Sequence, residues 1–316
     1  MATILDAIGR TPLVALQRIG RDLPRAVLVK CEHLNPGGSV KDRLARAIVD
    51  DAEARAQLPP GGTIVEATAG NTGMGLALVA AVRGYSLVCV LPEKMSIDKR
   101  VALADLGARV IVTPNAPPGH VDNFREVARA LAATEGWFLA DQFDNPANAR
   151  VHLETTGPEI LAQCGGALGA FVAGAGTGGT ITGVARYLAE AAPRARIVLA
   201  DPVGSALGDI VEHGAPRAEG PYLVEGIGAS KPGTAFDPRV VHRVERVSDD
   251  ESFAMARRLQ REEGLLVGGS AGTAVVAALR IAARTELALP EGPVVTVLPD
   301  AWDRYRSQAW MKPLAP

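Results

Sequence analysis

Cysteine and histidine are both scarce in this sequence. Cys31, Cys89 and Cys164 are odd in number and include no Cys-x-x-Cys pair, so neither a disulfide framework nor a zinc site is indicated. The five histidines are scattered, with no pair at i, i+4 spacing on one helix face. We therefore expect buried free thiols and no metal site.

The sequence also lacks a strong net charge and a long apolar run. Its formal net charge is -2, which gives no long-range field for nucleic acid or an anionic membrane. No stretch of about 18 uninterrupted apolar residues occurs, and residues 1–14 do not have the pattern of a secretory signal. We expect a cytoplasmic protein that binds neither nucleic acid nor membrane and acts on small molecules.

What the sequence does contain is a regular alternation of apolar runs and helical stretches. Apolar, β-branched runs that read as strands lie at residues 26–30, 63–65, 87–91, 110–112, 170–173, 197–199 and 294–298. Helix-like stretches lie at residues 72–83, 97–106, 121–133, 180–191, 250–263 and 273–283. Continuous apolar strands belong to sheets buried on both faces, so the order predicts an α/β fold of mostly parallel strands with helices on both sides.

Two irregular segments interrupt this alternation. Residues 142–149 read as a loop and as a domain boundary. Residues 201–238 are rich in glycine and proline and are long for a connection. Since long structureless segments are often functional, we expect the second one to cover a site.

Four short segments combine glycine with hydroxyl, amide or amine side chains. They lie at residues 35–43, 68–73, 174–180 and 268–272. At least the second and third follow a strand and open a helix. This places them at the carboxyl ends of strands, where open α/β sheets bind ligands.

The third segment has two interpretations. Gly174, Gly176 and Gly179 match the dinucleotide-binding pattern, and Asp201 follows at the end of a strand, so spacing alone supports an NAD-dependent dehydrogenase. Glycines before a helix equally suit a single phosphate. Thr177 and Thr180 favour that second interpretation, because hydroxyl groups add donors to converging phosphate oxygens.

Lysine is rare, and one lysine stands in the first segment. Only six lysines occur in the chain, and Lys41 lies in an otherwise small and flexible stretch. A Schiff base requires lysine and cannot be made by arginine. Lys41 is therefore a candidate for covalent attachment of a carbonyl compound.

Taken together, the four segments resemble the cystathionine β-synthase and cysteine synthase (O-acetylserine sulfhydrylase) family of fold type II, tryptophan-synthase-β-type enzymes. The likeness runs from Gly-Arg-Thr-Pro-Leu at residues 9–13 to Leu-Pro-Asp at residues 298–300. It implies two three-layer α/β/α domains with twisted sheets and pyridoxal 5′-phosphate in the cleft between them. The first implied domain is residues 1–145, which contains the lysine and the substrate-carboxylate loop and whose initial segment crosses to the other domain. The second is residues 146–316, which contains the phosphate loop and the serine that faces the pyridine nitrogen. A homodimer is also implied.

The resemblance assigns roles to individual residues. Lys41 would form the internal aldimine and then take the substrate's Cα proton, Asn71 would bind the cofactor's 3′-oxygen, and Ser270 would face the pyridine nitrogen. The residues that would bind the cofactor are Lys41, Asn71, Gly176, Thr177, Gly178, Gly179, Thr180 and Ser270. The residues that would bind substrate are Thr68, Ala69, Gly70, Asn71, Thr72, Gln142, Gly226 and Gly228.

The implied reaction is β-replacement on serine or O-acetylserine by a thiol through an α-aminoacrylate. Some segments look more like cystathionine β-synthase, which joins L-serine and L-homocysteine. Others look more like cysteine synthase, which makes L-cysteine and acetate from O-acetyl-L-serine and sulfide. The family's usual Thr-Ser-Gly-Asn-Thr-Gly loop has Ala69 in place of the serine, and this loss of a hydroxyl leaves the amino-acid substrate open.

Two readings from other classes remain at this point. One is the NAD-dependent dehydrogenase. The other is a catalytically silent partner protein that binds the cofactor only for assembly, against which the presence of both Lys41 and Asn71 argues.

Overall fold

The computed structural model describes residues 1–68, 70–93, 95, 97–217 and 219–312. The chain divides into two compact units. The first contains residues 1–8 and 35–147, and the second contains residues 9–34 and those from 148 onward. The chain passes from the first unit to the second after residue 147, two residues from the expected boundary at 145. Residues 9–34 also belong to the second unit, although residues on both sides of them belong to the first.

The first unit is built on a four-stranded parallel sheet with the order β5-β4-β3-β6. Its elements are η1 (Ile4–Ala7), α1 (Lys41–Ala54), β3 (Thr63–Ala67), α2 (Asn71–Arg83), β4 (Ser86–Pro92), α3 (Ile97–Asp105), β5 (Arg109–Thr113), α4 (Phe124–Glu135) and β6 (Phe138–Leu139). Ile64 and Leu87 pack in one apolar cluster with α1 and α2. Val65 and Val88 pack on the opposite face with α4, which makes three layers.

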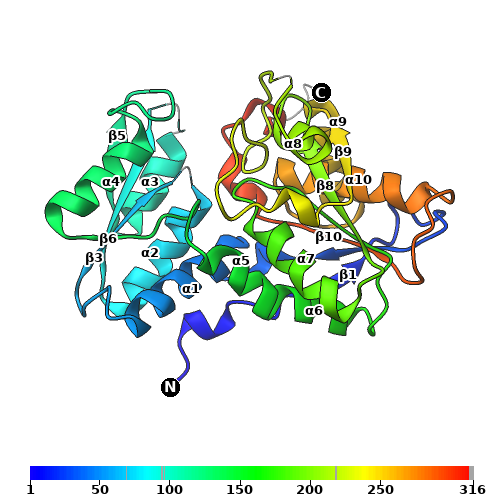
Figure 1. The fold of residues 1–316 in the computed structure, drawn as a ribbon, viewed down its shortest axis with the longest axis horizontal. Helices are drawn as coiled ribbons and strands as arrows, with labels where there is room; N and C mark the ends of the chain where they lie inside the picture. The colour runs from blue at the N-terminus through cyan, green and yellow to red at the C-terminus, as the bar shows by residue number, and fades with distance from the viewer. Residues whose placement is uncertain (69, 94, 96, 218, 313–316) are drawn as a thin grey trace. The chain divides into compact units, whose positions relative to one another are not determined.

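The second unit is built on a six-stranded sheet with the order β1-β2-β10-β7-β8-β9. Figure 1 labels four of these strands, namely β1, β8, β9 and β10. Its strands are β1 (Leu13–Ala15), β2 (Val27–Lys30), β7 (Ala170–Ala173), β8 (Arg196–Pro202), β9 (Arg243–Val247) and β10 (Val294–Val297). Its longer helices are α6 (Gly157–Gln163), α7 (Gly179–Ala191), α8 (Leu207–His213), α9 (Asp249–Glu262) and α10 (Gly269–Ala283). Shorter helical segments are η2 (Glu32–Leu34), α5 (Ala147–Val151), the π-helix η3 (His152–Thr156), η4 (Pro238–Val240), η5 (Trp302–Tyr305) and η6 (Ala309–Met311).

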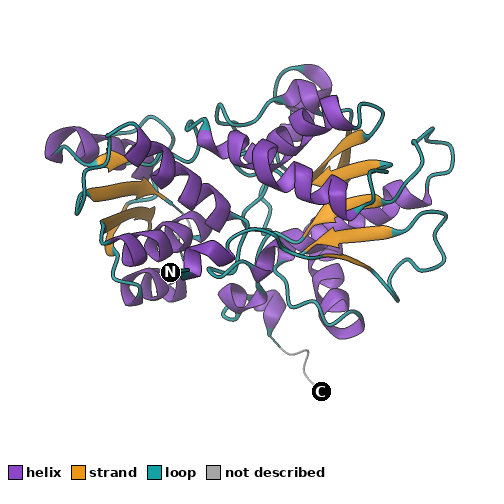
Figure 2. Cartoon of the chain, turned by 90° about the horizontal axis from the view of Figure 1, so that it is seen from below, coloured by secondary structure: helices purple, strands orange, loops and turns teal. Residues whose placement is uncertain are grey.

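This sheet is also covered on both faces. Val172 and Val198 lie in a cluster with α9 and α10, whereas Phe171 and Ile197 lie in a cluster with α6 and α7. Figure 2 shows the strands of each unit in orange, with purple helices around them. The three-layer arrangement expected from continuous apolar strands is therefore confirmed.

Several details differ from the sequence-based expectation. β1 pairs with β2 in the antiparallel direction, so the larger sheet is mixed rather than wholly parallel. β1, β6, β9 and α1 were not anticipated as elements. The segment 201–238, expected to be irregular, contains the short helix α8.

The cysteines are free, as expected, although their burial differs. Cys31 and Cys89 are buried and Cys164 is half-buried. Burial raises the pKa of the Cys31 and Cys89 thiols to about 12 and that of Cys164 to about 11. At neutral pH all three are therefore unreactive thiols. In the described part of the chain, no helix has both the length and the apolarity needed to cross a membrane.

Helix α7 lies very close to the chain segment 147–156, and Gly183 makes this approach possible. A Cβ atom at Gly183 would overlap the carbonyl oxygen of Ala149 and lie 2.7 Å from Cβ of His152. Main-chain atoms of segment 147–156 therefore fill the space beside Gly183.

We predict that Gly183→Ala lowers the free energy of unfolding by about 2–3 kcal/mol, because an added methyl group must push main chain apart. Glu190→Ala, on the exposed side of the same helix, is the matched control and should change it by less than about 0.5 kcal/mol. Urea denaturation of both variants measures the effect. Equal stabilities would show that α7 and segment 147–156 are not in close contact.

Candidate active site

Lys41 is the first residue of α1, at the end of a tightly turned loop. Its backbone N–H donates to Oγ of Ser39 at 3.2 Å. The carboxylate of Asp42 accepts a hydrogen bond from the backbone N–H of Gly37 at 2.5 Å, which closes the loop onto the helix. A Cβ at Gly37 would lie 2.5 Å from Oδ1 of Asp42, so a larger residue there would displace this carboxylate. The loop is thus held in one shape around Lys41.

Helix α2 packs against the first turn of α1. A Cβ at Gly75 would lie 3.0 Å from the carbonyl oxygen of Lys41 and 2.9 Å from Cβ of Ala45. Since α2 begins at Asn71, this contact brings the amino-terminal ends of both helices close together. The structure therefore places Lys41 and Asn71 in one region of the first unit.

The expected substrate loop leads into α2 and is held by its own hydroxyl groups. Oγ1 of Thr68 accepts hydrogen bonds from the backbone N–H groups of Gly70 at 3.2 Å and Gly73 at 3.1 Å. Gly70 has a φ of 152°, a conformation that favours glycine. Ala69, which belongs to the same expected site, lies outside the described residues.

Gln142 joins this loop from the segment that follows β6. Its side-chain oxygen accepts a hydrogen bond from Oγ1 of Thr72 at 2.6 Å, and its amide donates to the carbonyl oxygen of Ala67 at 3.2 Å. Thr68, Thr72 and Gln142 are all at least nine-tenths buried. Within the first unit, the structure thus brings together Thr68, Gly70, Asn71, Thr72 and Gln142.

Glu66, two residues before Thr68 of the loop, was not anticipated. It is fully buried in β3, where N–H groups of Gln142 and Asp141 favour the ionised carboxylate but do not outweigh the effect of burial. Burial, reinforced by the neighbouring Asp141 carboxylate, raises the pKa of Glu66 to about 8. The group is therefore protonated at neutral pH, which avoids burying an unpaired charge. The sequence signal that could have identified Glu66 is the presence of a glutamate within an apolar strand.

In the second unit, residues 174–180 form a loop between β7 and α7 that only glycine can build. A Cβ at Gly176 would overlap the carbonyl oxygen of Gly226, and one at Gly179 would overlap Oδ1 of Asn148. Gly178 has a φ of 86° and lies against Phe236. The loop ends at the first turn of a 13-residue helix, whose first N–H groups have no partner within the helix.

Both threonines of this loop have side-chain partners in segment 147–156. Nδ2 of Asn148 donates to Oγ1 of Thr177 at 2.9 Å, and Nε2 of His152 lies 3.2 Å from Oγ1 of Thr180. Asn148 and His152 were not identified from the sequence, because they lie 29 and 28 residues away from the threonines that they contact.

The segment around Gly226 and Gly228 packs against the 174–180 loop. The N–H of Gly228 donates to the carbonyl oxygen of Ala175 at 2.7 Å, and a Cβ at Gly174 would lie 2.7 Å from Cγ2 of Ile227. Gly226 and Gly228 both have positive φ values, of 86° and 79°. The structure thus places these two expected residues beside Gly176.

Ser270 lies in the first turn of α10 and is 3% exposed. The turn is held to the segment after β10, since the N–H of Gly268 donates to the carbonyl oxygen of Asp300 at 3.2 Å. β10 is the neighbour of β7 in the parallel part of the sheet. Ser270 and the 174–180 loop therefore lie at the same carboxyl edge of one sheet.

Asp201 lies at the carboxyl end of β8, but its carboxylate is bonded within the protein. Its buried carboxylate accepts a hydrogen bond from the backbone N–H of Gly208 at 2.8 Å, at the start of α8. Burial raises the pKa of Asp201 to about 6. Asp201 therefore has a structural role in this unit, which weakens the dehydrogenase interpretation.

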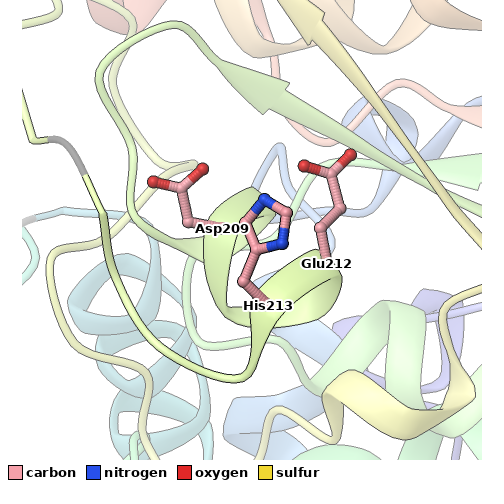
Figure 3. Close-up of side chains that lie close together, drawn as sticks. All are labelled: Asp209, Glu212 and His213. Atoms are coloured by element: carbon pink, nitrogen blue, oxygen red, sulfur yellow. The ribbon is translucent and has the colours of Figure 1, made fainter.

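One group of three side chains in the described part of the chain has the spacing of metal ligands, namely Asp209, Glu212 and His213 on α8 (Figure 3). The guanidinium of Arg246 already contacts both carboxylates, at 2.7 Å and 2.8 Å. This ion-pair network accounts for the acidic residues, and we assign no metal to it.

Each unit contains residues whose chemistry suits one part of pyridoxal phosphate. The 174–180 loop offers a cradle that Cβ atoms would fill, two hydroxyl groups and a helix amino terminus, which together suit a phosphate group. Lys41 supplies an amine at a fixed helix start, and Ser270 supplies a neutral hydroxyl.

The protonated state of Glu66 leads to a pH-dependent prediction. The pKa is higher in the folded chain, so the folded chain keeps a proton that the unfolded chain releases. This stabilising contribution is complete below about pH 4.5 and is lost as the pH rises towards 8. Glu66→Gln is neutral throughout and should become more stable relative to the wild type by about 2–4 kcal/mol between pH 5 and pH 8. Denaturant unfolding at several pH values measures this difference. A difference that does not vary with pH would mean that Glu66 is already ionised in the fold.

Comparison with known proteins agrees with this chemistry. A model of the pyridoxal-phosphate dependent enzyme family matches residues 4–300. Cystathionine β-synthase of Apis mellifera is 43% identical across 99% of this chain, and that of Oryctolagus cuniculus is 44% identical across 96%. The chain spans only 62% and 55% of the lengths of these relatives.

Two solved structures match over nearly their whole length. O-ureido-L-serine synthase has a TM-score of 0.90 and 41% identity, covering 100% of this chain and 96% of that one. The O-acetylserine dependent cystathionine β-synthase of Helicobacter pylori has a TM-score of 0.88 and 40% identity, covering 99% of each chain. With the family match over residues 4–300, these likenesses show that the chain belongs to the family of pyridoxal-phosphate dependent enzymes.

Proposed function

We propose that this protein replaces the β-substituent of a serine-type amino acid with a thiol, with pyridoxal 5′-phosphate as its cofactor. The observation that carries the proposal is the pairing of a fixed lysine with a loop of hydroxyl groups. Lys41 starts α1 where the amino terminus of α2 packs, and Thr68, Thr72 and Gln142 are joined at that same end. The relatives named cystathionine β-synthase support the reaction class.

Lys41 would hold the cofactor through its amine, and the same amine, once free, would take the proton from the substrate's Cα. The bound cofactor supplies an electron-withdrawing ring that stabilises negative charge at that carbon. Asn71 donates to the cofactor's 3′-oxygen. Residues 68–72 and Gln142 bind the substrate carboxylate through hydroxyl and N–H groups at the start of α2. These roles belong to the domain of residues 1–145.

Residues 176–180 bind the cofactor's phosphate, and Ser270 places a neutral hydroxyl beside the pyridine nitrogen. A hydroxyl leaves that nitrogen unprotonated, whereas a carboxylate would favour its protonation. A neutral hydroxyl at Ser270 would thereby make the bound ring a weaker electron sink, which suits loss of the β-group. Gly226 and Gly228 line the entry to the pocket. These roles belong to the domain of residues 146–316.

The substrates we propose are L-serine and L-homocysteine, which give L-cystathionine and water. The relatives named cystathionine β-synthase support this pair. The alternative is O-acetyl-L-serine and sulfide, which give L-cysteine and acetate. The Helicobacter pylori protein, an O-acetylserine dependent cystathionine β-synthase, supports O-acetylserine as the first substrate in that alternative. A role in transsulfuration or cysteine biosynthesis, a cytoplasmic location and a homodimeric state are further proposals that the resemblance alone supports.

We predict that reduction of the purified protein with borohydride fixes the cofactor to Lys41 and bleaches its yellow colour. Peptide mass spectrometry should find the added mass on the peptide that contains Lys41. Lys99→Arg is the matched control and should carry the same adduct, while Lys41→Arg should carry none because arginine cannot form the link. An adduct on Lys99 in the wild type would overturn the assignment.

Product identification should decide between the substrate pairs. Serine and O-acetylserine are each offered with homocysteine and with sulfide, and the products are identified by mass spectrometry. We expect cystathionine to be the main product in the homocysteine reactions. Cysteine formed faster than cystathionine at equal thiol concentrations would establish the alternative. No product in any of the four reactions would contradict β-replacement.

A further inference from the structure

Two glycines, Gly268 and Gly269, begin the turn of α10 that carries Ser270, and aromatic rings lie against both. A Cβ at Gly268 would overlap Cε2 of Tyr305 in η5. A Cβ at Gly269 would lie 2.8 Å from Cε1 of Phe253 in α9. Ser270 therefore follows two positions that are in contact with aromatic rings from other elements.

The ring of Trp310, in η6, is the third member of this aromatic cluster. It stacks on the Phe253 ring, with 4.9 Å between the centroids and 11° between the planes, and its centroid lies 6.0 Å from that of Tyr305. Nε of Arg257 in α9 donates to the carbonyl oxygen of Trp310 at 2.9 Å. Residues 302–311, the C-terminal segment, are thereby held on α9 and on the start of α10.

The hydroxyl of Tyr305 ties the C-terminal segment to the residue that holds the turn. It donates to Oδ2 of Asp300 at 2.6 Å, and both side chains are buried. Asp300 in turn accepts the N–H of Gly268 at its carbonyl oxygen, and its Oδ1 would lie 2.5 Å from a Cβ at Gly268. Burial and the Asp300 carboxylate raise the pKa of Tyr305 well above its usual value, so the hydroxyl stays a donor.

Helix α10 depends on such contacts because it follows another helix. The strand β7 leads into α7, whereas α10 comes after α9. Val267, just before the turn, forms an isolated antiparallel bridge with Ala301, and the N–H of Trp302 donates to the carbonyl oxygen of Leu266 at 3.3 Å. Contacts with the C-terminal segment and the residues leading into it therefore place the start of α10.

The C-terminal segment also contacts residues beside the 174–180 loop. Nε2 of Gln308 donates to Oε1 of Glu225 at 2.8 Å. Glu225 precedes Gly226, whose carbonyl oxygen a Cβ at Gly176 would overlap. One segment thus touches both the turn that carries Ser270 and the residues that support the 174–180 loop.

We propose that the C-terminal segment is a clamp in which Tyr305, Gln308 and Trp310 set the spacing between Ser270 and the 174–180 loop. The inference rests on the proposed function, in which these two places bind the ring nitrogen and the phosphate of one cofactor. A ligand bound at both places needs a spacing that matches its own covalent frame, whereas a ligand bound only at the loop does not. The three side chains are therefore positioning residues.

The test compares pyridoxal phosphate, which uses both places, with inorganic phosphate, which uses the loop alone. After removal of the cofactor, the dissociation constant of pyridoxal phosphate and the inhibition constant of phosphate as its competitor are measured. Tyr305→Phe keeps the ring and loses the bond to Asp300, and Trp310→Ala loses the stacked ring. We expect each to raise the first constant about five- to tenfold and to change the second by less than about twofold. Trp310→Phe, which keeps a stacked ring, should bind both as the wild type does.

Trp302→Ala is the matched control within the C-terminal segment. The Trp302 ring lies against the guanidinium of Arg306, at 4.7 Å, and its loss should change neither constant. Wild-type affinity for pyridoxal phosphate in Tyr305→Phe would overturn the proposal. A parallel loss of phosphate affinity would also overturn it, because the segment would then only support the loop. A wild-type protein that binds no pyridoxal phosphate would instead contradict the proposed function.

A separate variant tests the contact with Glu225. Gln308→Met keeps the length of the side chain and removes its donor, so it should raise the dissociation constant of pyridoxal phosphate about threefold and leave the phosphate constant unchanged. Gln17→Met is the matched control, since the amide of Gln17 is exposed and donates to the carbonyl oxygen of Ala15. Equal cofactor affinity in Gln308→Met and the wild type would show that the segment does not set the spacing.

Discussion

Close approach of main chain to main chain is the constraint on which the candidate site depends. At Gly176 the loop touches the carbonyl oxygen of Gly226, and at Gly179 it touches the side chain of Asn148. A single Cβ at either position would occupy space that another segment already fills. The loop, the segment at residues 226–228 and the segment at residues 148–156 therefore pack closely together within the second unit. Any substitution of these glycines should disturb all three.

The first unit also contains a glycine that allows a close approach of main chain. Gly75 lets α2 approach the carbonyl oxygen of Lys41, which brings the amino ends of two helices together. Helix amino ends carry partial positive charge and unpaired N–H groups, so each unit gathers groups suited to anions. In the first unit the expected anion is a substrate carboxylate, and in the second it is a phosphate. The parallel order of the strands explains why both sites follow strand ends.

Most of the fold was predictable from sequence because its central strands are apolar on both faces. β4 and β7 read as continuous apolar runs, whereas β9 has the sequence Arg-Val-Glu-Arg-Val and lies at a sheet edge, where charged side chains are tolerated. The expected helices did not include α1, although Ser39, whose Oγ accepts a hydrogen bond from the N–H of Lys41, is of a residue type that favours helix starts. β6, with two residues, is too short to produce a period.

The residues of the candidate site were also only partly predictable from sequence. Glycines, threonines and Lys41 could be identified because their spacing within short segments carries the chemistry. Asn148, His152 and Glu66 could not, because their roles come from neighbours that folding brings to them. His152 contacts Thr180 across 28 residues, and Glu66 acquires its raised pKa only by burial beside Asp141. No local pattern distinguishes such residues from ordinary core positions.

The central claim is that residues 174–180 bind the phosphate of the cofactor, and one measurement tests it directly. The dissociation constant of pyridoxal phosphate is determined for the wild type and for the double variant Thr177→Val, Thr180→Val, which keeps side-chain size and removes both donors. A hydrogen bond to a charged group is worth about 1.5–3 kcal/mol, so the account predicts a dissociation constant at least about a hundredfold higher in the double variant. A double variant that binds the cofactor as tightly as the wild type would contradict the account.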